Sequence, residues 1–341
     1  MKFLHRNICI YILTICTVVT AAAQHLDTSR WISYLNDSTP VAQLSIPGAH
    51  NAATGEGFCF NAGFGKTQSL SLSKLWDCGI RFFDLRPAVD GNTLHIYHGP
   101  LKTRIPFNDA LSLICNKLEQ YPEEFAIVLL REENKSKAQL WAQLVGEAIE
   151  TLGDKAAHFS PGMTVGETRG KILFISRNAY TGCNKGACAT GWSHTKEGNS
   201  NAQLTSFSDG CKARLQIQDY YDTTNKKKLE AKQNAVHRFI EAAGHSSTDT
   251  WTINFLSAYS TTWLKATSFA TTAGYKRNAG TINRMVADIL ENRAKDKCSS
   301  TGILVMDFAG VDKASGELWH WHTFDTHGNR LTRLIIEQNF R

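Results

Sequence analysis

The sequence predicts an α/β chain that folds as an irregular (β/α)8 barrel of the TIM type, in a single domain. Apolar, β-rich runs alternate with amphipathic helical patterns, and the apolar runs number eight. Of the 341 residues, 42% are apolar, which is enough for one large buried core. Nearly continuous apolar strands separated by helices are typical of a parallel sheet covered by helices, and eight such units can close into a barrel.

Each predicted strand is a short apolar run bounded by turn or charged residues. The predicted strands are residues 41–46, 80–86, 94–98, 125–131, 171–177, 214–219, 251–256 and 302–307. Helical periodicity lies between most of these runs and once after the last one. The predicted helices are residues 108–120, 135–152, 225–243, 281–295 and 330–338.

Two segments depart from this repeat. Few residues separate Arg86 from Leu94, whereas a crossover between parallel strands takes about a dozen or more residues. We therefore expect an extended connection there and an irregular barrel. Residues 178–210 are rich in Gly, Ser, Asn and Thr without periodicity, and this composition predicts one long loop at the rim.

The start of the chain has the pattern of a secretory signal. A basic start is followed by an apolar stretch at residues 8–19 and by small residues ending at Ala23. We expect cleavage after Ala23, a mature domain of residues 24–341, and export to a periplasm or beyond. A transmembrane anchor is less favoured because the apolar run is shorter than the roughly 20 residues that span a bilayer. Attachment to the cell surface through Cys16 is left open.

Cysteine content and charge limit the class of protein further. Seven cysteines follow residue 23, so at least one thiol is unpaired, and Cys183 with Cys188 is the first candidate for a disulfide in an exported protein. The net charge of +6 suits anionic lipid surfaces or anionic substrates. Basic residues are scattered along the chain, and this pattern argues against nucleic acid as a partner.

Charged and imidazole side chains recur where the predicted strands end. They are His50, Arg86, His98, Arg131, Arg177, Asp219 and Asp307. In a barrel the carboxyl ends of the strands surround one mouth, and barrel enzymes place their active sites there. One such residue alone is more often a structural group, but seven at equivalent ends predict a common site.

The residue types predict acid and base chemistry on a phosphate. One imidazole can take a proton from an alcohol, and a second, protonated imidazole can donate one to a leaving oxygen. Arginine binds and neutralises phosphate oxygens, and a buried carboxylate such as Asp307 can fix the tautomer of a histidine. The sequence lacks the motifs of serine hydrolases, phosphate-binding loops and zinc proteases. We therefore predict transfer of a phosphodiester from one alcohol to another.

Five motifs in this order resemble the bacterial phosphatidylinositol-specific phospholipase C family, whose catalytic domain is of the X type. The motifs are residues 46–51, 79–86, 97–100, 170–177 and 218–221. The resemblance runs from about Leu44 to Asp307. It implies a phosphodiesterase that acts on phosphatidylinositol or on glycosylphosphatidylinositol at a membrane surface, which it contacts peripherally and transiently. A monomer without cofactor is expected.

The resemblance also implies the role of each residue. His50 would be the general base that takes the proton of the inositol 2-hydroxyl, with Asp307 orienting it. His98 would be the general acid for the diacylglycerol oxygen, and Arg86 would neutralise the phosphate. The products would be diacylglycerol and inositol 1,2-cyclic phosphate.

Further residues would bind the sugar. Asp219 and Arg177 would hold inositol hydroxyls with a contribution from Arg131, and Tyr221 would stack on the ring. Asn51 is counted with these substrate-binding residues.

Asn51 also departs from the family pattern, because bacterial members usually carry Asp directly after the first catalytic histidine. Asp84 is the nearest carboxylate in the sequence that could take its place as the partner of His98. Two alternatives remain open. A calcium-dependent relative would use Asn51, Asp84 and Glu132 as oxygen ligands, but Arg86 stands where such relatives carry an acidic ligand, so we predict no metal. A non-catalytic barrel that binds a sugar or a lipid is the other alternative.

Overall fold

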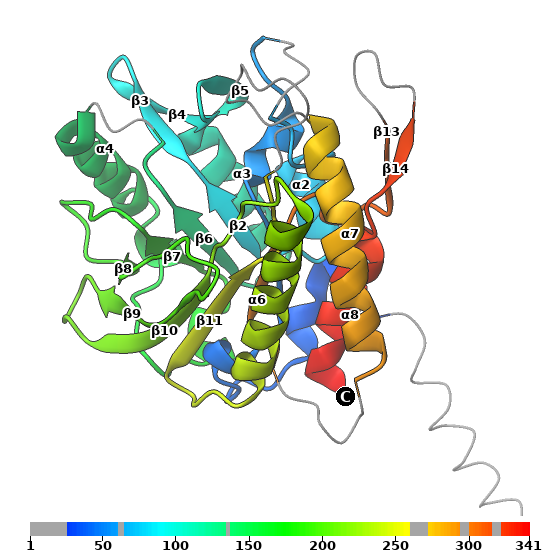
Figure 1. The fold of residues 1–341 in the computed structure, drawn as a ribbon. Coiled ribbons are helices and arrows are strands. Elements are labelled where there is room, and N and C mark those ends of the chain that lie inside the picture. The colour runs from blue at the N-terminus through cyan, green and yellow to red at the C-terminus, as the bar shows by residue number, and fades with distance from the viewer. Residues whose placement is uncertain (1–25, 61–64, 134–136, 260–271, 294–299, 316–321) are drawn as a thin grey trace, which may run out of the picture.

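The computed structural model describes residues 26–60, 65–133, 137–259, 272–293, 300–315 and 322–341 (Figure 1). The predicted signal segment 1–23 lies outside the described residues, as does Cys298. None of the described helices combines the length and the apolar character needed to cross a membrane.

The described strands include a closed barrel, which confirms the predicted fold class. Around the barrel the order is β1-β12-β11-β10-β9-β8-β7-β6-β2, and β2 closes the circle by pairing with β1. Its strands are β1 (Ile46–Ala49), β2 (Phe82–Leu85), β6 (Ala126–Leu130), β7 (Ile172–Ser176), β8 (Ala187–Thr190), β9 (Asn199–Ser206), β10 (Lys212–Gln218), β11 (Thr250–Phe255) and β12 (Ile303–Met306). The first predicted strand, residues 41–46, begins too early, because Val41–Gln43 form the 3-10 turn η2.

The long loop predicted for residues 178–210 is wrong, because this stretch contributes β8 and β9 to the barrel. Both pairings of β9 are antiparallel, with β8 on one side and β10 on the other. Alternate residues of the two strands are buried, as in any half-buried strand. Several of the buried residues are alanines, among them Ala187, Ala189 and Ala202. The apolar alternation was therefore too weak to stand out in the sequence.

The predicted third barrel strand, residues 94–98, is also wrong in its place. It corresponds to β4 (Thr93–His98), which forms a separate antiparallel sheet with β3 (Pro87–Asp90) and β5 (Leu101–Pro106). A tight turn at Gly91, whose φ of 61° suits glycine, folds β4 back on β3. The short connection between Arg86 and Leu94 is thus strand β3 and a tight turn. His98 therefore lies beside the barrel rather than in its wall.

All five predicted helices are present. The α-helices of the described chain are α2 (Leu72–Asp77), α3 (Phe107–Gln120), α4 (Ala138–Glu150), α5 (Val165–Thr168), α6 (Lys226–Gly244), α7 (Thr272–Glu291) and α8 (Gly328–Glu337). Helix α7 starts earlier than predicted. Its first turns contain the poor helix formers Gly274 and Gly280, so no helical signal stood out there in the sequence. Gly280 allows the carbonyl oxygen of Asp325, in β14 (Thr323–Asp325), to approach so closely that a Cβ there would lie 2.3 Å from it.

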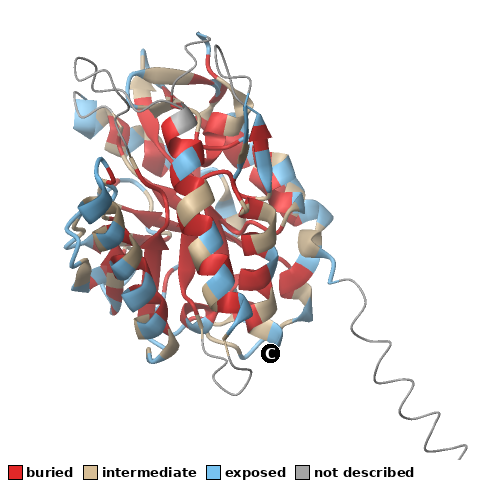
Figure 2. Ribbon diagram, turned by 45° about the vertical axis from the view of Figure 1, so that its right-hand side comes forward, coloured by how far each residue is buried: buried red, intermediate tan, exposed pale blue. Residues whose placement is uncertain are grey.

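Apolar side chains form two layers around the barrel wall. Ile127 and Leu129 of β6 belong to one cluster with the inward residues of the other strands, whereas Ala126, Val128 and Leu130 pack with the surrounding helices. Figure 2 shows the strands at the centre of the molecule mostly buried and the helices exposed on their outer side. The inner cluster also takes in Trp31 from η1 (Thr28–Tyr34), so the start of the described chain fills the barrel interior from one end.

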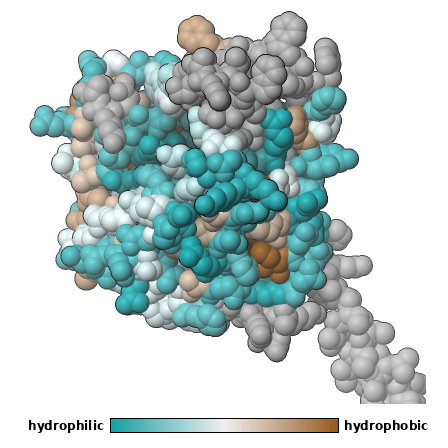
Figure 3. Space-filling model, viewed as in Figure 1, coloured by the Kyte–Doolittle hydropathy of each residue, from teal (hydrophilic) through white to brown (hydrophobic). Residues whose placement is uncertain are grey.

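The face of the molecule in Figure 3 is mainly polar. The described cysteines are unpaired. On the face in Figure 3 the described side chains are largely hydrophilic, with hydrophobic areas that stay small and separate. The six described cysteines are free thiols, so the predicted pairing of Cys183 with Cys188 is not formed. Cys183 lies before β8, where its sulfur accepts a hydrogen bond from the Lys185 amide (3.5 Å), whereas Cys188 is part of the strand.

Candidate active site

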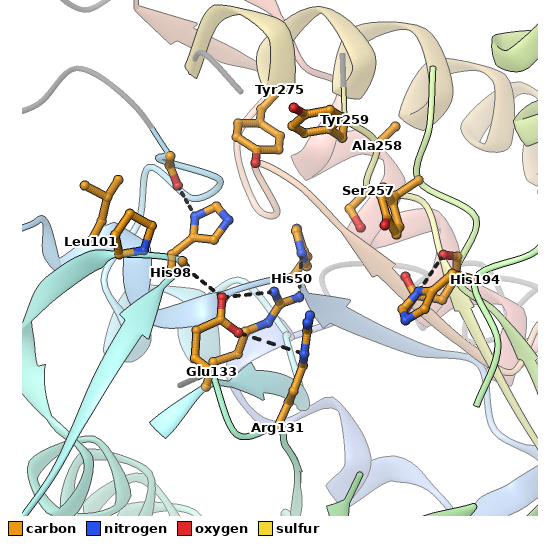
Figure 4. Close-up of a pocket in the computed structure, with 16 residues that line it drawn as sticks. His50, His98, Leu101, Arg131, Glu133, His194, Ser257, Ala258, Tyr259 and Tyr275 are labelled. Atoms are coloured by element: carbon orange, nitrogen blue, oxygen red, sulfur yellow. Dashed lines mark hydrogen bonds and ion pairs between the residues drawn. The ribbon is translucent and has the colours of Figure 1, made fainter. Parts of the chain in front are cut away.

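A cavity of about 340 Å³ opens at the carboxyl ends of the barrel strands (Figure 4). Six of the ten residues predicted for the site line this cavity: His50, Arg86, His98, Arg131, Asp219 and Tyr221. The other four lie behind the lining and contact it: Asn51, Asp84, Arg177 and Asp307. The structure therefore brings together every predicted site residue, although it does not test the role of any of them.

His50 follows β1 and is oriented by Asp307, which follows β12. The Nδ1 atom of His50 lies 2.7 Å from Oδ1 of Asp307. Burial raises the pKa of Asp307, and the charge of His50 acts in the opposite direction. Because the carboxylate can only accept, Nδ1 carries the proton in the neutral ring, and the lone pair of Nε2 faces the cavity side.

The Nε2 atom of His50 meets two hydrogen-bond donors. Nη2 of Arg86 lies 2.9 Å from it, and Nδ2 of Asn51 lies 3.0 Å from it. Both contacts suit an unprotonated Nε2, which is the form that a general base needs. Asn51 is 3% exposed and lies behind the cavity lining, where its side chain contacts His50. Its role as a substrate-binding residue stays a prediction.

Asp84 holds Arg86, and its predicted role as the partner of His98 stays a prediction. Oδ2 of Asp84 accepts from Nη2 of Arg86 (3.1 Å) and from the backbone amide of Asn51 (3.1 Å). Burial lowers the pKa of Arg86, but the charges of Asp84 and Glu133 outweigh it and raise that pKa above its ordinary value. Asp84 thus fixes the guanidinium at the end of β2, and its hydrogen bonds go to Arg86 and to the Asn51 amide.

His98 ends β4 and reaches the cavity from the side sheet. Its Nδ1–H donates to the carbonyl oxygen of Gly65 (2.6 Å), which leaves Nε2 for a ligand. The ring centres of His98 and His50 are 6.3 Å apart, and the planes are inclined by 77°. Burial and the positive charge of Arg86 lower the pKa of His98 to about 4. The ring is therefore neutral near pH 7 while the cavity holds no anion.

Glu133 is a carboxylate whose charge acts on the pKa of His98, and the sequence analysis did not predict it as a site residue. Its Oε1 accepts from the amide of Gly99 (2.6 Å) and lies 3.8 Å from Nη1 of Arg86, while Oε2 lies 3.9 Å from Nε of Arg131. Its charge acts to raise the pKa of His98. Glu133 follows β6 by a few residues, beside another glutamate, so nothing in the local sequence singled it out.

A second group of polar side chains forms the opposite wall of the cavity. Asp219 follows β10 and accepts from Nε1 of Trp192 (2.8 Å), and it lies 3.5 Å from Nη1 of Arg177. Burial raises the pKa of Asp219, but its hydrogen bond to His194 and neighbouring cations prevail and lower it to about 2. The Arg177 guanidinium also lies 4.3 Å above the Trp192 ring. Asp219 is thus a fixed anion beside a cation.

His194 belongs to this wall and was not predicted either. Its Nδ1 is 3.1 Å from Oδ2 of Asp219, and its Nε2 accepts from Nη2 of Arg177 (3.1 Å). Its ring meets Tyr221 edge to face, with centres 5.4 Å apart. His194 lies between β8 and β9, in the segment that we had predicted to be a loop, and a lone histidine in such a segment carries no signal of its own.

Two further features bear on the site. Within the residues that the structure describes, no group of three or more His, Cys, Asp or Glu side chains is placed to hold a metal ion. The absence of a cofactor stays a prediction.

Behind the site, the fully buried Lys232 of α6 donates to the carbonyl oxygen of Phe255 (2.5 Å), and burial lowers the pKa of Lys232 to about 7.

Comparisons with known proteins agree with this geometry. The chain is 25% identical over 291 residues to 1-phosphatidylinositol phosphodiesterase of Listeria monocytogenes. The match covers 82% of this chain and 81% of the relative. It is 26% identical over 173 residues to mouse PI-PLC X domain-containing protein 1, across 40% of this chain and 49% of the relative. The chain matches no protein-family model.

Solved structures share the fold. The phosphatidylinositol-specific phospholipase C of Listeria monocytogenes superposes with a TM-score of 0.67 at 23% identity, over 92% of this chain and 99% of the other. A variant of the Staphylococcus aureus enzyme of the same name gives a TM-score of 0.70 at 22% identity, over 92% and 98%. These matches support the barrel fold.

Proposed function

We propose that this chain, which is a homologue of the bacterial phosphatidylinositol-specific phospholipases C, cleaves phosphatidylinositol between the phosphate and the diacylglycerol. The inositol 2-hydroxyl would attack the phosphorus, so that the products are diacylglycerol and inositol 1,2-cyclic phosphate. One observation carries the proposal: two imidazoles stand 6.3 Å apart at one cavity, and Arg86 contacts the first of them. That spacing leaves room for a phosphate between an acid and a base.

His50 supplies the base in this proposal. The 2-hydroxyl displaces one of the two donors from Nε2 and gives its proton to that atom as its oxygen bonds to phosphorus. The Asp307 carboxylate, 2.7 Å from Nδ1, stabilises the imidazolium that forms. The fork of Arg86, held by Asp84, neutralises the phosphate oxygens as charge builds on them.

His98 supplies the acid. The bond between phosphorus and the glycerol oxygen breaks, and that oxygen takes a proton from Nε2 of His98. Burial and Arg86 lower the pKa of His98 and so disfavour its protonated form before the substrate binds. A bound phosphodiester brings a negative charge that offsets Arg86, and Glu133 adds to it. Substrate binding therefore raises the pKa of the acid when it is needed.

The opposite wall of the cavity would hold the inositol ring. Asp219 accepts hydrogen bonds from ring hydroxyls, and Arg177 donates to them, with Arg131 near the same space. Tyr221 is 46% exposed at the rim and offers a flat face to the ring. These contacts involve parts of the substrate that do not react, so they position the phosphodiester against the two histidines.

The setting of the reaction is part of the proposal. The substrate lies in a membrane surface, so the protein would contact that surface peripherally and transiently, as a monomer. Glycosylphosphatidylinositol presents the same phosphodiester and ring and is an alternative substrate. The pattern of residues 1–23 supports export to a periplasm or to the medium.

Phosphorus NMR of the purified protein with phosphatidylinositol vesicles tests the proposal, with and without a chelator. We expect a cyclic phosphodiester signal that a chelator does not abolish. His50→Ala and His98→Ala should each lose most of this product while the protein stays folded, and His237→Ala, on an exposed turn of α6, should not. Near-normal rates in either active-site variant would refute the assignment.

The same experiment separates the two alternatives. Loss of product on chelation would indicate a calcium-dependent relative. Binding of inositol without any product would indicate a barrel that binds the headgroup but does not cleave it.

A further inference from the structure

Tyr275 is a pocket residue for which the reaction above has no use. It lies in the first turns of α7 and lines the cavity together with His50, Arg86 and His98. The residue is 7% exposed. Figure 4 shows its hydroxyl directed into the cavity, on the side of His98 and His50. Within the described part of the chain, no group forms a hydrogen bond with this hydroxyl.

Packing alone does not account for a tyrosine here. The ring is inclined by 48° to that of His98, with centres 5.9 Å apart. Phenylalanine would make the same contact. The hydroxyl is open to the cavity rather than sealed from it. With no partner in the described part of the chain, it is placed to donate a hydrogen bond to a bound ligand.

The helix that carries Tyr275 is held in place. Asn283, two turns further along α7, donates to the backbone carbonyl of Asp307 (3.1 Å) and to that of Thr326 (2.9 Å). The close approach of Gly280 to the Asp325 carbonyl fixes the same part of the helix. The hydroxyl therefore has a defined position relative to Asp307 and, through it, to His50.

The surroundings identify the group that Tyr275 would meet. Arg86 enters the cavity from the end of β2, whereas Tyr275 enters it from α7, beside His98. Burial and the charge of Asp307 raise the pKa of Tyr275, so the hydroxyl keeps its proton and can donate it to an anion. A phosphodiester has two non-bridging oxygens, and Arg86 is placed for one of them.

We propose that Tyr275 donates a hydrogen bond to the second non-bridging oxygen of the phosphodiester, the one that Arg86 does not hold. Tyr275 would then be a further catalytic residue. The inference rests on the proposed function, because it takes the substrate to be a phosphodiester that lies between His50 and His98.

The test uses Tyr275→Phe, which keeps the ring and removes only the hydroxyl. With phosphatidylinositol, we expect kcat/KM to fall about tenfold or more, the usual cost of losing one hydrogen bond to a charged oxygen. The two phosphorothioate diastereomers of the substrate each replace one non-bridging oxygen by sulfur, a poor acceptor. The variant should lose clearly less activity on the isomer with sulfur at the Tyr275 position than on the other. Equal losses on both isomers, or no loss, would overturn the proposal.

A binding experiment keeps the result independent of turnover. Affinities for glycerophosphoinositol, which has the phosphodiester, and for myo-inositol, which lacks it, are measured for both proteins. Tyr275→Phe should weaken only the first, about tenfold. Equal affinities of wild type and variant for glycerophosphoinositol would overturn the inference. Unchanged binding of myo-inositol shows that the variant is folded.

A matched control and the wild type separate the two proposals. Tyr97→Phe changes a half-buried tyrosine on the strand of His98 that does not line the cavity, and it should alter neither experiment. If the wild type fails to cleave phosphatidylinositol, the proposed function fails. The binding comparison still decides whether Tyr275 contacts the phosphodiester.

Discussion

The imidazole of His50 stands nearly perpendicular to that of His98, with ring centres 6.3 Å apart. The two rings are too far apart to share a hydrogen bond, and each has its Nδ1 fixed by a different partner, Asp307 for His50 and Gly65 for His98. Each ring therefore keeps one nitrogen for a ligand.

Replacing Asp307 by Asn should remove most activity without unfolding the protein. An amide oxygen can still accept from Nδ1 of His50, but it carries no charge to stabilise the imidazolium, and a flipped amide would favour the wrong tautomer. We expect kcat to fall about 10³-fold or more. Steady-state assays on phosphatidylinositol measure the loss, and thermal unfolding serves as the control. A variant with kcat within tenfold of wild type would contradict the role of Asp307.

Binding of an anionic headgroup should take up a proton at His98. The pKa of this ring is about 4 in the empty site, and a bound phosphodiester raises it. The complex then holds more protons than the free protein, so affinity rises as pH falls from the pKa of the complex towards 4. Calorimetry of glycerophosphoinositol binding in buffers of different ionisation enthalpy measures the uptake. His98→Gln should abolish it, and zero uptake by the wild type would contradict the prediction.

Glu133→Gln should weaken the acid step. Glutamine keeps an acceptor for the Gly99 amide but loses the charge that raises the pKa of His98. We expect kcat to fall about tenfold and the proton uptake on binding to decrease. Glu132→Gln, at the neighbouring position, is the comparison, and equal effects of the two changes would argue against a specific role for Glu133.

His194→Ala should act on substrate binding more than on turnover. The ring bridges Asp219 and Arg177 on the wall that faces the sugar, away from the reacting atoms. We expect KM to rise about tenfold while kcat changes little, because an interaction of this kind is made equally in the ground state and the transition state. A fall in kcat with unchanged KM would place His194 in the chemical step instead.

Lys232→Met should change how stability depends on pH. Burial lowers the pKa of Lys232 to about 7 from its ordinary 10.5. Between these values the unfolded chain binds more protons than the folded one, so the contribution of Lys232 to the free energy of unfolding rises with pH. From pH 7 to 10, wild type should gain stability relative to Lys232→Met in urea unfolding. Lys226→Met, at an exposed lysine of the same helix, should behave as wild type, and parallel curves for all three proteins would sink the prediction.

Much of the barrel could be predicted because its parallel strands are apolar on both faces. Strands β6, β7 and β11 are buried at every residue, so they appear in the sequence as nearly continuous apolar runs. The antiparallel strands β8 and β9 have one polar face and small inward residues, and they merge with the loop around them. Hairpin β3–β4 was misplaced because a run of alternating residues does not say which sheet it joins.

The site residues that could be predicted are those that stand at the ends of strands. His50, Arg86, Asp219 and Asp307 fall into this class, and parallel strands deliver their ends to one edge. Glu133, His194 and Tyr275 come from a strand connection, a hairpin and a helix start. Their positions depend on tertiary packing that no local pattern contains. Asp84 was found, but its ion pair with Arg86, two residues further along the same strand end, was not foreseen.

The side sheet that carries His98 has a consequence for how this protein could diversify. In the proposed reaction, the groups that activate the attacking hydroxyl belong to the ring of parallel strands, whereas the acid that releases the alcohol lies on a hairpin with its own backbone ladder. Evolution or an engineer can therefore lengthen, shift or replace that hairpin to suit a different leaving alcohol. The machinery that recognises the sugar and activates its hydroxyl would remain intact.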